Sequence, residues 1–146
     1  YPTLEEEKVI LERMVVEREL RVNPVLKPSD LDYMREILAD LYMEERLKHY
    51  ILNLVQATRY PQRYPSISSL TGLIQYGASP RATIFLARTA KANAYLEHRA
   101  YVIPDDIKAI GKDVLRHRII LSYEAEAEQV STEDIITRIF EEIEVP

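Results

Sequence analysis

Residues 77–98 read GASPRATIFLARTAKANAYLEH, and the beginning of this stretch is suited to start a helix. Gly77 permits a turn, and Ser79 is a candidate N-cap. Pro80 takes the first helical position, where its missing N–H costs nothing and its fixed φ suits a helix. We predict a helix that runs to about His98. Five alanines allow other backbones to approach closely, so we expect it to be the central helix of the fold: Ala82, Ala87, Ala90, Ala92 and Ala94.

Arg81 places a fixed positive charge in the first turn of this helix. The aligned peptide dipoles already make a helix N-terminus partly positive, so the arginine costs a little free energy there. The residues alone leave two interpretations open. In the first, Arg81 is a surface residue that pairs with an acid such as Glu97 or Asp105. In the second, its guanidinium and the helix amides point together at an anion, a geometry that suits phosphate.

Helical patterns also dominate the rest of the chain. Only three glycines occur, and no run alternates apolar and polar residues as a strand does. A first helix is predicted to begin at Thr3, where Glu6 completes a capping box, and to end before Asn23-Pro24. Further helices are predicted from Ser29 or Asp30, over residues 43–59, from Pro104, and from Ser131 or Thr132.

The helix over residues 43–59 has the clearest apolar face, and Tyr60-Pro61 is expected to end it. Residues 61–76 contain two prolines and a glycine, which favours a loop with a short turn of helix. Residues 118–123 could hold a short extended segment. Together these patterns predict an all-α fold, a small bundle of about five to six helices, in a single domain of residues 1–146. The expected apolar face consists of Leu47, Tyr50, Ile51, Leu54, Val55 and Thr58.

Composition restricts the kind of protein. The chain has 146 residues, a formal net charge of −5 and no cysteine. The acidic balance argues against a nucleic-acid-binding surface, which needs clustered Lys and Arg. No apolar run approaches the length of a membrane span and no signal peptide opens the chain, so we expect a cytoplasmic location. Because the first residue is Tyr1 rather than Met, we expect the sequence to be part of a longer protein.

Motifs for catalysis by this chain alone are absent from the sequence. It contains neither a phosphate-binding loop nor a dinucleotide-binding Gly-x-Gly-x-x-Gly turn. The histidines lack partners at zinc-ligand spacing, so we expect no metal site. The serines have no nucleophile-elbow context, and the acidic run over residues 124–128 favours a solvated face. We therefore expect no enzymatic activity from this chain by itself. The histidines and serines concerned are His49, His98, His117, Ser68, Ser69 and Ser122.

Several strings considered together resemble the C-terminal helical lid of MoxR-family AAA+ ATPases. They occur in the family's order over nearly all of the chain: YPTLEEEKVIL, LKHYILNLVQATR, GASPRA, YVIPDDIKAI, DVLRHRIILSYEAEAE and STEDIITRIFEEIEVP. GASPR resembles the family's sensor 2 motif, which implies a nucleotide-contacting segment of Gly77, Ala78, Ser79, Pro80 and Arg81. In this resemblance Arg81 contacts the γ-phosphate of ATP. Residues 60–76 are longer than the family's usual connection at this place.

The resemblance implies that the full-length protein is an ATPase that uses ATP and Mg²⁺. The phosphate loop and the Mg²⁺-binding acids would belong to an upstream AAA+ core domain, and Tyr1-Pro2 would mark its junction with the lid. The resemblance further implies a chaperone-like function in a homo-oligomeric ring, expected to be a hexamer, with a von Willebrand factor A protein as partner. No nucleotide is expected to bind tightly to this chain alone.

Two points stay open from the sequence. The cluster Arg116-His117-Arg118 either faces a neighbouring subunit or the nucleotide, or is solvated or paired within the chain. Short helices with tight turns also describe a free-standing interaction module or a helix-turn-helix DNA-binding module. The acidic balance and the lack of a basic recognition helix argue against DNA binding.

Overall fold

The computed structural model describes residues 1–15 and 22–146, and it divides into two compact units, Tyr1–Tyr33 and Met34–Pro146. The single domain expected for residues 1–146 stays a prediction. The first helix was predicted to end before Asn23-Pro24, and the residues just before this point, 16–21, lie outside the described part of the chain.

The first unit contains α1 (Leu4–Val15) and the beginning of α2 (Pro28–Asp40). The predicted capping box of α1 is confirmed. The Thr3 N–H and hydroxyl donate to Glu6 Oε2 at 2.7 and 2.9 Å, and the Glu6 N–H donates to the Thr3 hydroxyl at 3.4 Å. These bonds hold the pKa of Glu6 below its ordinary value. Before α2, the Lys27 N–H donates to Asp30 Oδ2 at 2.8 Å, so that helix begins close to the predicted position.

In the second unit, α3 (Glu45–Arg59) buries the whole face predicted for it, from Leu47 to Thr58. The prediction of a loop over residues 61–76 was incomplete. Two 3₁₀ helices, η1 (Pro61–Arg63) and η2 (Pro65–Leu70), precede a short strand, β1 (Ile74–Tyr76). This strand pairs antiparallel with β2 (Ile120–Leu121), the extended segment predicted near residues 118–123. So short a strand is stabilised by a distant partner, which local sequence patterns do not reveal.

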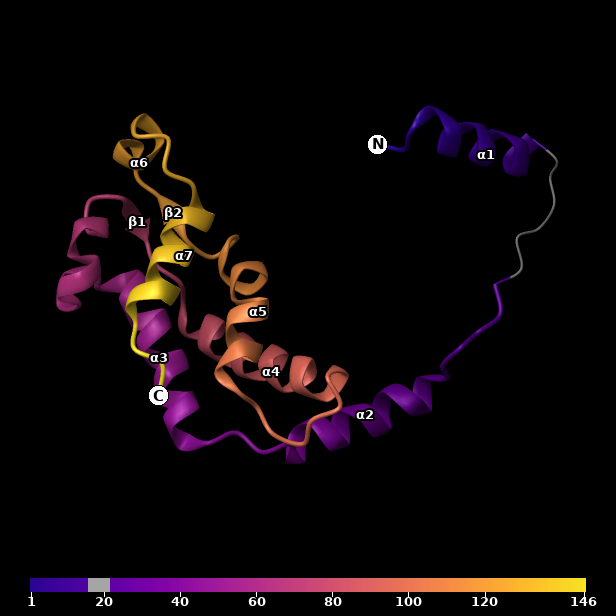
Figure 1. Cartoon of the computed structure of the whole chain (residues 1–146), viewed down its shortest axis with the longest axis horizontal. Coiled ribbons are helices and arrows are strands. Elements are labelled where there is room, and N and C mark those ends of the chain that lie inside the picture. Colours follow the sequence, from indigo (N-terminus) through magenta and orange to yellow (C-terminus); the bar gives the residue numbers. More distant parts are fainter. Residues whose placement is uncertain (16–21) are drawn as a thin grey trace. The chain divides into compact units, whose positions relative to one another are not determined.

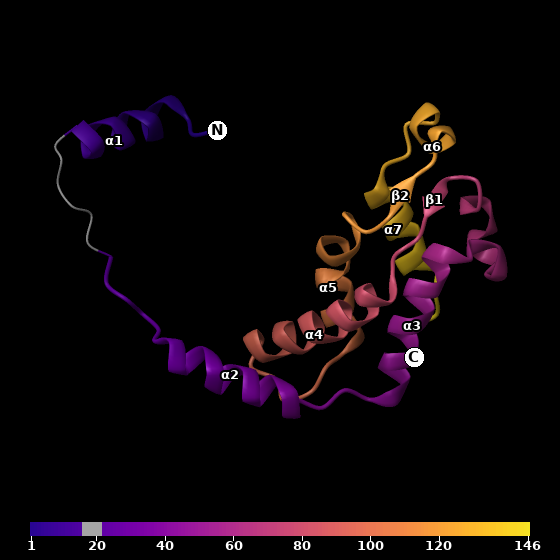
Figure 2. The same ribbon diagram turned by 180° about the vertical axis from the view of Figure 1, so that it is seen from behind.

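The centre of the second unit is α4 (Pro80–Leu96), which packs against both α3 and α5 (Pro104–Leu115) (Figures 1 and 2). Ala82, Leu86, Ala90 and Ala94 of α4 are completely buried, which confirms its predicted central place. Small side chains on this face let the neighbouring helices approach closely. Helices α6 (Tyr123–Ala127) and α7 (Thr132–Glu142) complete the unit, and Ser131 caps α7 as predicted.

The all-α prediction is confirmed, with one small two-stranded sheet among the described residues. Seven α-helices and two 3₁₀ helices occur over residues 1–15 and 22–146. The short α6 was not expected. In this part of the chain, no helix is long and apolar enough to cross a membrane.

Candidate functional site

The backbone that leads into α4 is held against the end of α3. The Thr58 hydroxyl donates to the Val55 carbonyl at 2.7 Å and accepts from the Ala78 N–H at 2.9 Å. Arg59 Nε donates to the Ala78 carbonyl at 2.5 Å. Thr58 and Ala78 are completely buried. Side chains of α3 therefore satisfy both polar groups of the Ala78 backbone and fix the start of α4.

Gly77 is needed at this junction because two backbones meet there. A Cβ atom at position 77 would lie 2.3 Å from the Thr58 carbonyl oxygen and 2.8 Å from the Arg59 Cα. No described glycine has a positive φ, so an unusual backbone turn is not the reason for glycine at this position. The interpretation that Gly77 permits a turn is therefore corrected: Gly77 allows α3 and the start of α4 to touch.

We expect Gly77→Ala to lower the free energy of unfolding by about 2 kcal/mol, because the added methyl group overpacks against backbone that cannot rotate away. Urea unfolding followed by circular dichroism measures this change. Gly72→Ala is the matched control. Its Cβ would meet Glu124 Oε2 at 2.8 Å, the end of an exposed side chain that can move aside. We expect the control to change stability by less than about 0.5 kcal/mol; equal losses in both variants would contradict the close-approach explanation.

The start of α4 lies where the sequence predicts it, but the expected capping hydrogen bond from the Ser79 side chain is not formed. Ser79 occupies the N-cap and Pro80 the first helical position of α4. The Ser79 side chain makes no capping hydrogen bond, although its carbonyl accepts from the Ala82 N–H at 2.8 Å. The residues that secure this helix start are therefore Thr58 and Arg59 of α3.

Arg81 is exposed in the first turn of α4, where no acidic residue accompanies it. Within residues 1–15 and 22–146 it has no hydrogen-bond or ion-pair partner, so the pairing with Glu97 or Asp105 is not present there. A free guanidinium beside a helix N-terminus is a suitable set of donors for a phosphate group. This segment is therefore a candidate site for a phosphate group.

The basic cluster Arg116-His117-Arg118 is largely used within the chain. Arg116 pairs with Asp113 and, at 3.3 Å, with Glu133. Arg118 Nε donates to the Val114 carbonyl at 2.9 Å, and its guanidinium lies 4.7 Å from the centre of the Phe85 ring. Of the alternatives for this cluster, both arginines therefore show contacts within the chain.

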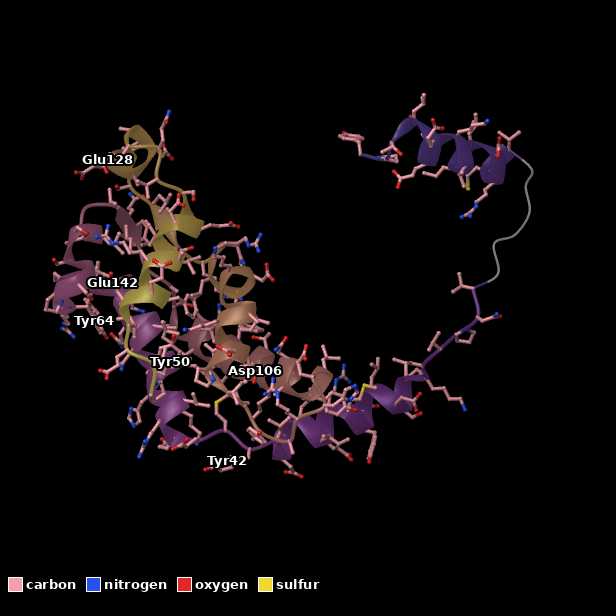
Figure 3. All side chains as sticks on the ribbon, viewed as in Figure 1. Tyr42, Tyr50, Tyr64, Asp106, Glu128 and Glu142 are labelled. Atoms are coloured by element: carbon pink, nitrogen blue, oxygen red, sulfur yellow. The ribbon has the colours of Figure 1, made fainter. Side chains whose placement is uncertain are left out.

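A buried carboxylate joins α4 to α5. Asp106, labelled in Figure 3, is completely buried. Its carboxylate accepts from Arg99 at 2.7 and 2.5 Å, from Asn93 Nδ2 at 2.8 Å and from the Ile103 N–H at 2.8 Å. Burial acts to raise the pKa of Asp106, but the bonds from Arg99, the Ile103 N–H and Asn93 outweigh it and leave that pKa below its ordinary value. Asp106 therefore stays ionised and holds the turn after α4 against α5.

Comparisons with known proteins identify the fold of this segment. The family model for the AAA lid domain matches residues 71–139, which include Arg81 and Asp106. Over its whole length the chain is 35% identical to Chaperone MoxR1 of Mycobacterium tuberculosis. The chain belongs to the MoxR family. Protein MoxR of Methylorubrum extorquens is 36% identical over 70% of this chain.

A solved structure agrees with this assignment. A crystal structure of a proposed ATPase from Cytophaga hutchinsonii matches the whole chain with a TM-score of 0.87 and 39% identity. The MoxR-family chain spans less than half of each relative: 38% of Chaperone MoxR1, 31% of Protein MoxR and 44% of the Cytophaga chain. The matches to Chaperone MoxR1 and to the Cytophaga chain cover the whole of this chain and therefore include the AAA lid residues 71–139.

Sequence reasoning proposed Arg81 as a site residue of this MoxR-family lid but missed the residues that hold the start of α4, where Arg81 lies. Thr58 was assigned to an apolar face, whereas its hydroxyl links the end of α3 to Ala78. The sequence signal for this role was a polar residue, Thr58, at the end of an otherwise apolar stripe and directly before Arg59. Asp106 lies in the first turn of α5, but its burial and its pairing with Arg99 depend on how α4 and α5 pack. No group of three or more His, Asp or Glu that could hold a metal occurs among the residues described.

Proposed function

We propose that this lid closes over ATP held by an AAA+ core domain of the full-length protein, and that Arg81 contacts the γ-phosphate. The observation that carries the proposal is the state of Arg81: an exposed cation in the first turn of α4, with no partner in the described part of the chain. A positive charge at a positive helix end is unfavourable unless an anion joins it.

The proposed role of Arg81 follows from the chemistry of phosphoryl transfer. Negative charge spreads over the oxygens of the transferred group, and a positioned arginine stabilises that charge. In the proposal, Mg²⁺ and the phosphate loop belong to the core domain. The segment from Gly77 to Pro80 presents the helix N-terminus to the nucleotide. This chain alone is expected to show no ATP hydrolysis.

The junction between α3 and α4 supports a coupling role. Because Thr58 and Arg59 fix the backbone at Ala78, a force on Arg81 is transmitted to both helices. Arg81 would have a partner while the γ-phosphate is present and would lose it after hydrolysis. The lid would then turn as a body, as hinge-type closures do.

The wider activity is part of the same proposal. One relative of this chain is named a chaperone, Chaperone MoxR1. We propose that the full-length form of this protein likewise acts as a chaperone-like factor that remodels protein complexes or helps them mature. We further propose a homo-oligomeric ring, a hexamer, with a von Willebrand factor A protein as partner, in the cytoplasm. The alternative of a helix-turn-helix DNA-binding module has no observation in its favour.

Hydrogen exchange in the full-length protein tests the closure. With a non-hydrolysable ATP analogue, the amides of Ser79 and of residues 81–84 should exchange more slowly than with ADP, because the phosphate occupies the N-terminus of α4. The exposed N-terminus of α7 is the internal control and should exchange equally in both states. Identical exchange of Ser79 and residues 81–84 with the analogue and with ADP would contradict the proposal.

A further inference from the structure

A groove on the second unit is lined by residues of α4 from Thr83 onward and by none of the residues from Gly77 to Arg81. It has a volume of about 830 Å³ and is formed by the last turns of α2 together with α3 and α4. Residues of α4 enter it at helical spacing, from Thr83 through Ala87 to Lys91, so the wall extends over about two turns of that helix. Nothing in the proposed contact between Arg81 and ATP uses this surface.

The floor of the groove is apolar and partly open to solvent. Leu52 of α3 is 44% exposed and Ile84 of α4 is 51% exposed, although both side chains are large and hydrophobic. Ala39 and Ala87 also line the groove. Their small side chains leave space for side chains of another molecule to approach the backbone. The groove thus offers apolar contact area at its centre that this unit does not cover.

The charged residues of the groove are all basic. Arg35, Lys48, Arg88 and Lys91 line it, and none of its described lining residues is acidic. Arg88 has no partner in the part of the chain that the structure describes, and Lys91 Nζ donates to the neutral Ala39 carbonyl at 2.9 Å. Lys48 Nζ pairs with Glu45 Oε2 at 2.8 Å, at the edge of the groove. This positive charge is concentrated locally in a chain of net charge −5.

We propose that this groove is a docking site for a helix of a partner protein that carries an apolar stripe flanked by acidic residues. Its apolar side chains at i, i+3, i+4 and i+7 would lie on the floor between α3 and α4, the usual way a helix binds in a groove. Its acidic residues would face Arg88 and Lys91, and this charge complementarity would select the partner.

Fluorescence anisotropy with the full-length protein tests the proposal. The probe is a labelled amphipathic helical peptide, about 18 residues long, with a leucine stripe and glutamates on both sides of it. We expect saturable binding at about 0.1 M salt. The same peptide with every glutamate replaced by lysine should bind at least about tenfold more weakly. Absence of saturable binding, or equal binding of the two peptides, would overturn the proposal.

Two variants localise the binding. Arg88→Glu and Ile84→Ser should each weaken the acidic peptide about tenfold, because one reverses the rim charge and the other removes apolar floor. Arg138→Glu is the matched control on α7, since Arg138 is exposed and without a partner among the described residues; it should bind the peptide like the wild type. Unchanged binding to Arg88→Glu, or an equal loss in Arg138→Glu, would refute the site. If Ile84→Ser alters the oligomeric state in sedimentation and leaves peptide binding intact, the groove is covered by a second copy and the proposal is wrong.

Discussion

Replacing Arg81 with alanine in the full-length protein is expected to lower kcat for ATP hydrolysis about a hundredfold or more. The guanidinium is proposed to stabilise charge that develops on the γ-phosphate, and the loss of one such preorganised donor costs about 10² to 10³ in rate. Because Arg81 is exposed and has no polar partner within the described residues, the substitution removes no hydrogen bond or ion pair of the lid. A coupled ATPase assay measures the effect, and circular dichroism checks that the lid stays folded.

Two further variants separate this role from a general effect of charge. Arg138→Ala removes an exposed arginine of α7 and should leave kcat within about twofold of wild type. Arg81→Lys keeps the charge but loses the forked donors, so it should recover only part of the activity. Wild-type turnover in Arg81→Ala would exclude the γ-phosphate contact and leave Arg81 as an ordinary surface residue.

Replacing Asp106 with alanine is expected to lower the free energy of unfolding by about 3 kcal/mol. The substitution removes a carboxylate that is completely buried and bound by Arg99, Asn93 and the Ile103 N–H, so these donors lose their acceptor. Asp105→Ala is the matched control, because Asp105 is the exposed neighbour in the same helical turn. We expect the control to change stability by less than about 0.5 kcal/mol in urea unfolding.

The contribution of Asp106 should also depend on pH in a defined direction. Its pKa in the folded state is below the ordinary value of 3.8, so the folded state favours the ionised form. The stabilisation is therefore fully present above about pH 4 and is lost as the pH falls through the folded-state pKa. Asp106→Asn, which does not ionise, should lose less stability than wild type between pH 5 and pH 3, values chosen on either side of about 4. Equal acid sensitivity of the two proteins would contradict this assignment.

Local signals were enough to predict most helices. Thr3 with Glu6, Ser131 before α7, and proline at the starts of α4 and α5 are start signals that act over a few residues, and all are seen in the structure. The alanines of α4 correctly predicted a central helix, because small side chains such as Ala82, Ala90 and Ala94 let neighbouring helices approach closely. The strand β1 could not be predicted, since its partner β2 lies far along the chain.

The candidate site also has features that the sequence predicts locally and features that depend on tertiary packing. The residues 77–81 by themselves were enough to indicate a helix start with an unusual cation, because capping and the helix dipole act within one turn. Only the tertiary structure showed that Gly77 touches the backbone of Thr58, that Thr58 and Arg59 hold Ala78, and that Arg99 neutralises Asp106. These contacts join different segments of the chain, and their geometry depends on how α3, α4 and α5 pack. Sequence therefore determined where the helices begin and which cation to examine, while packing decided what holds that cation in place.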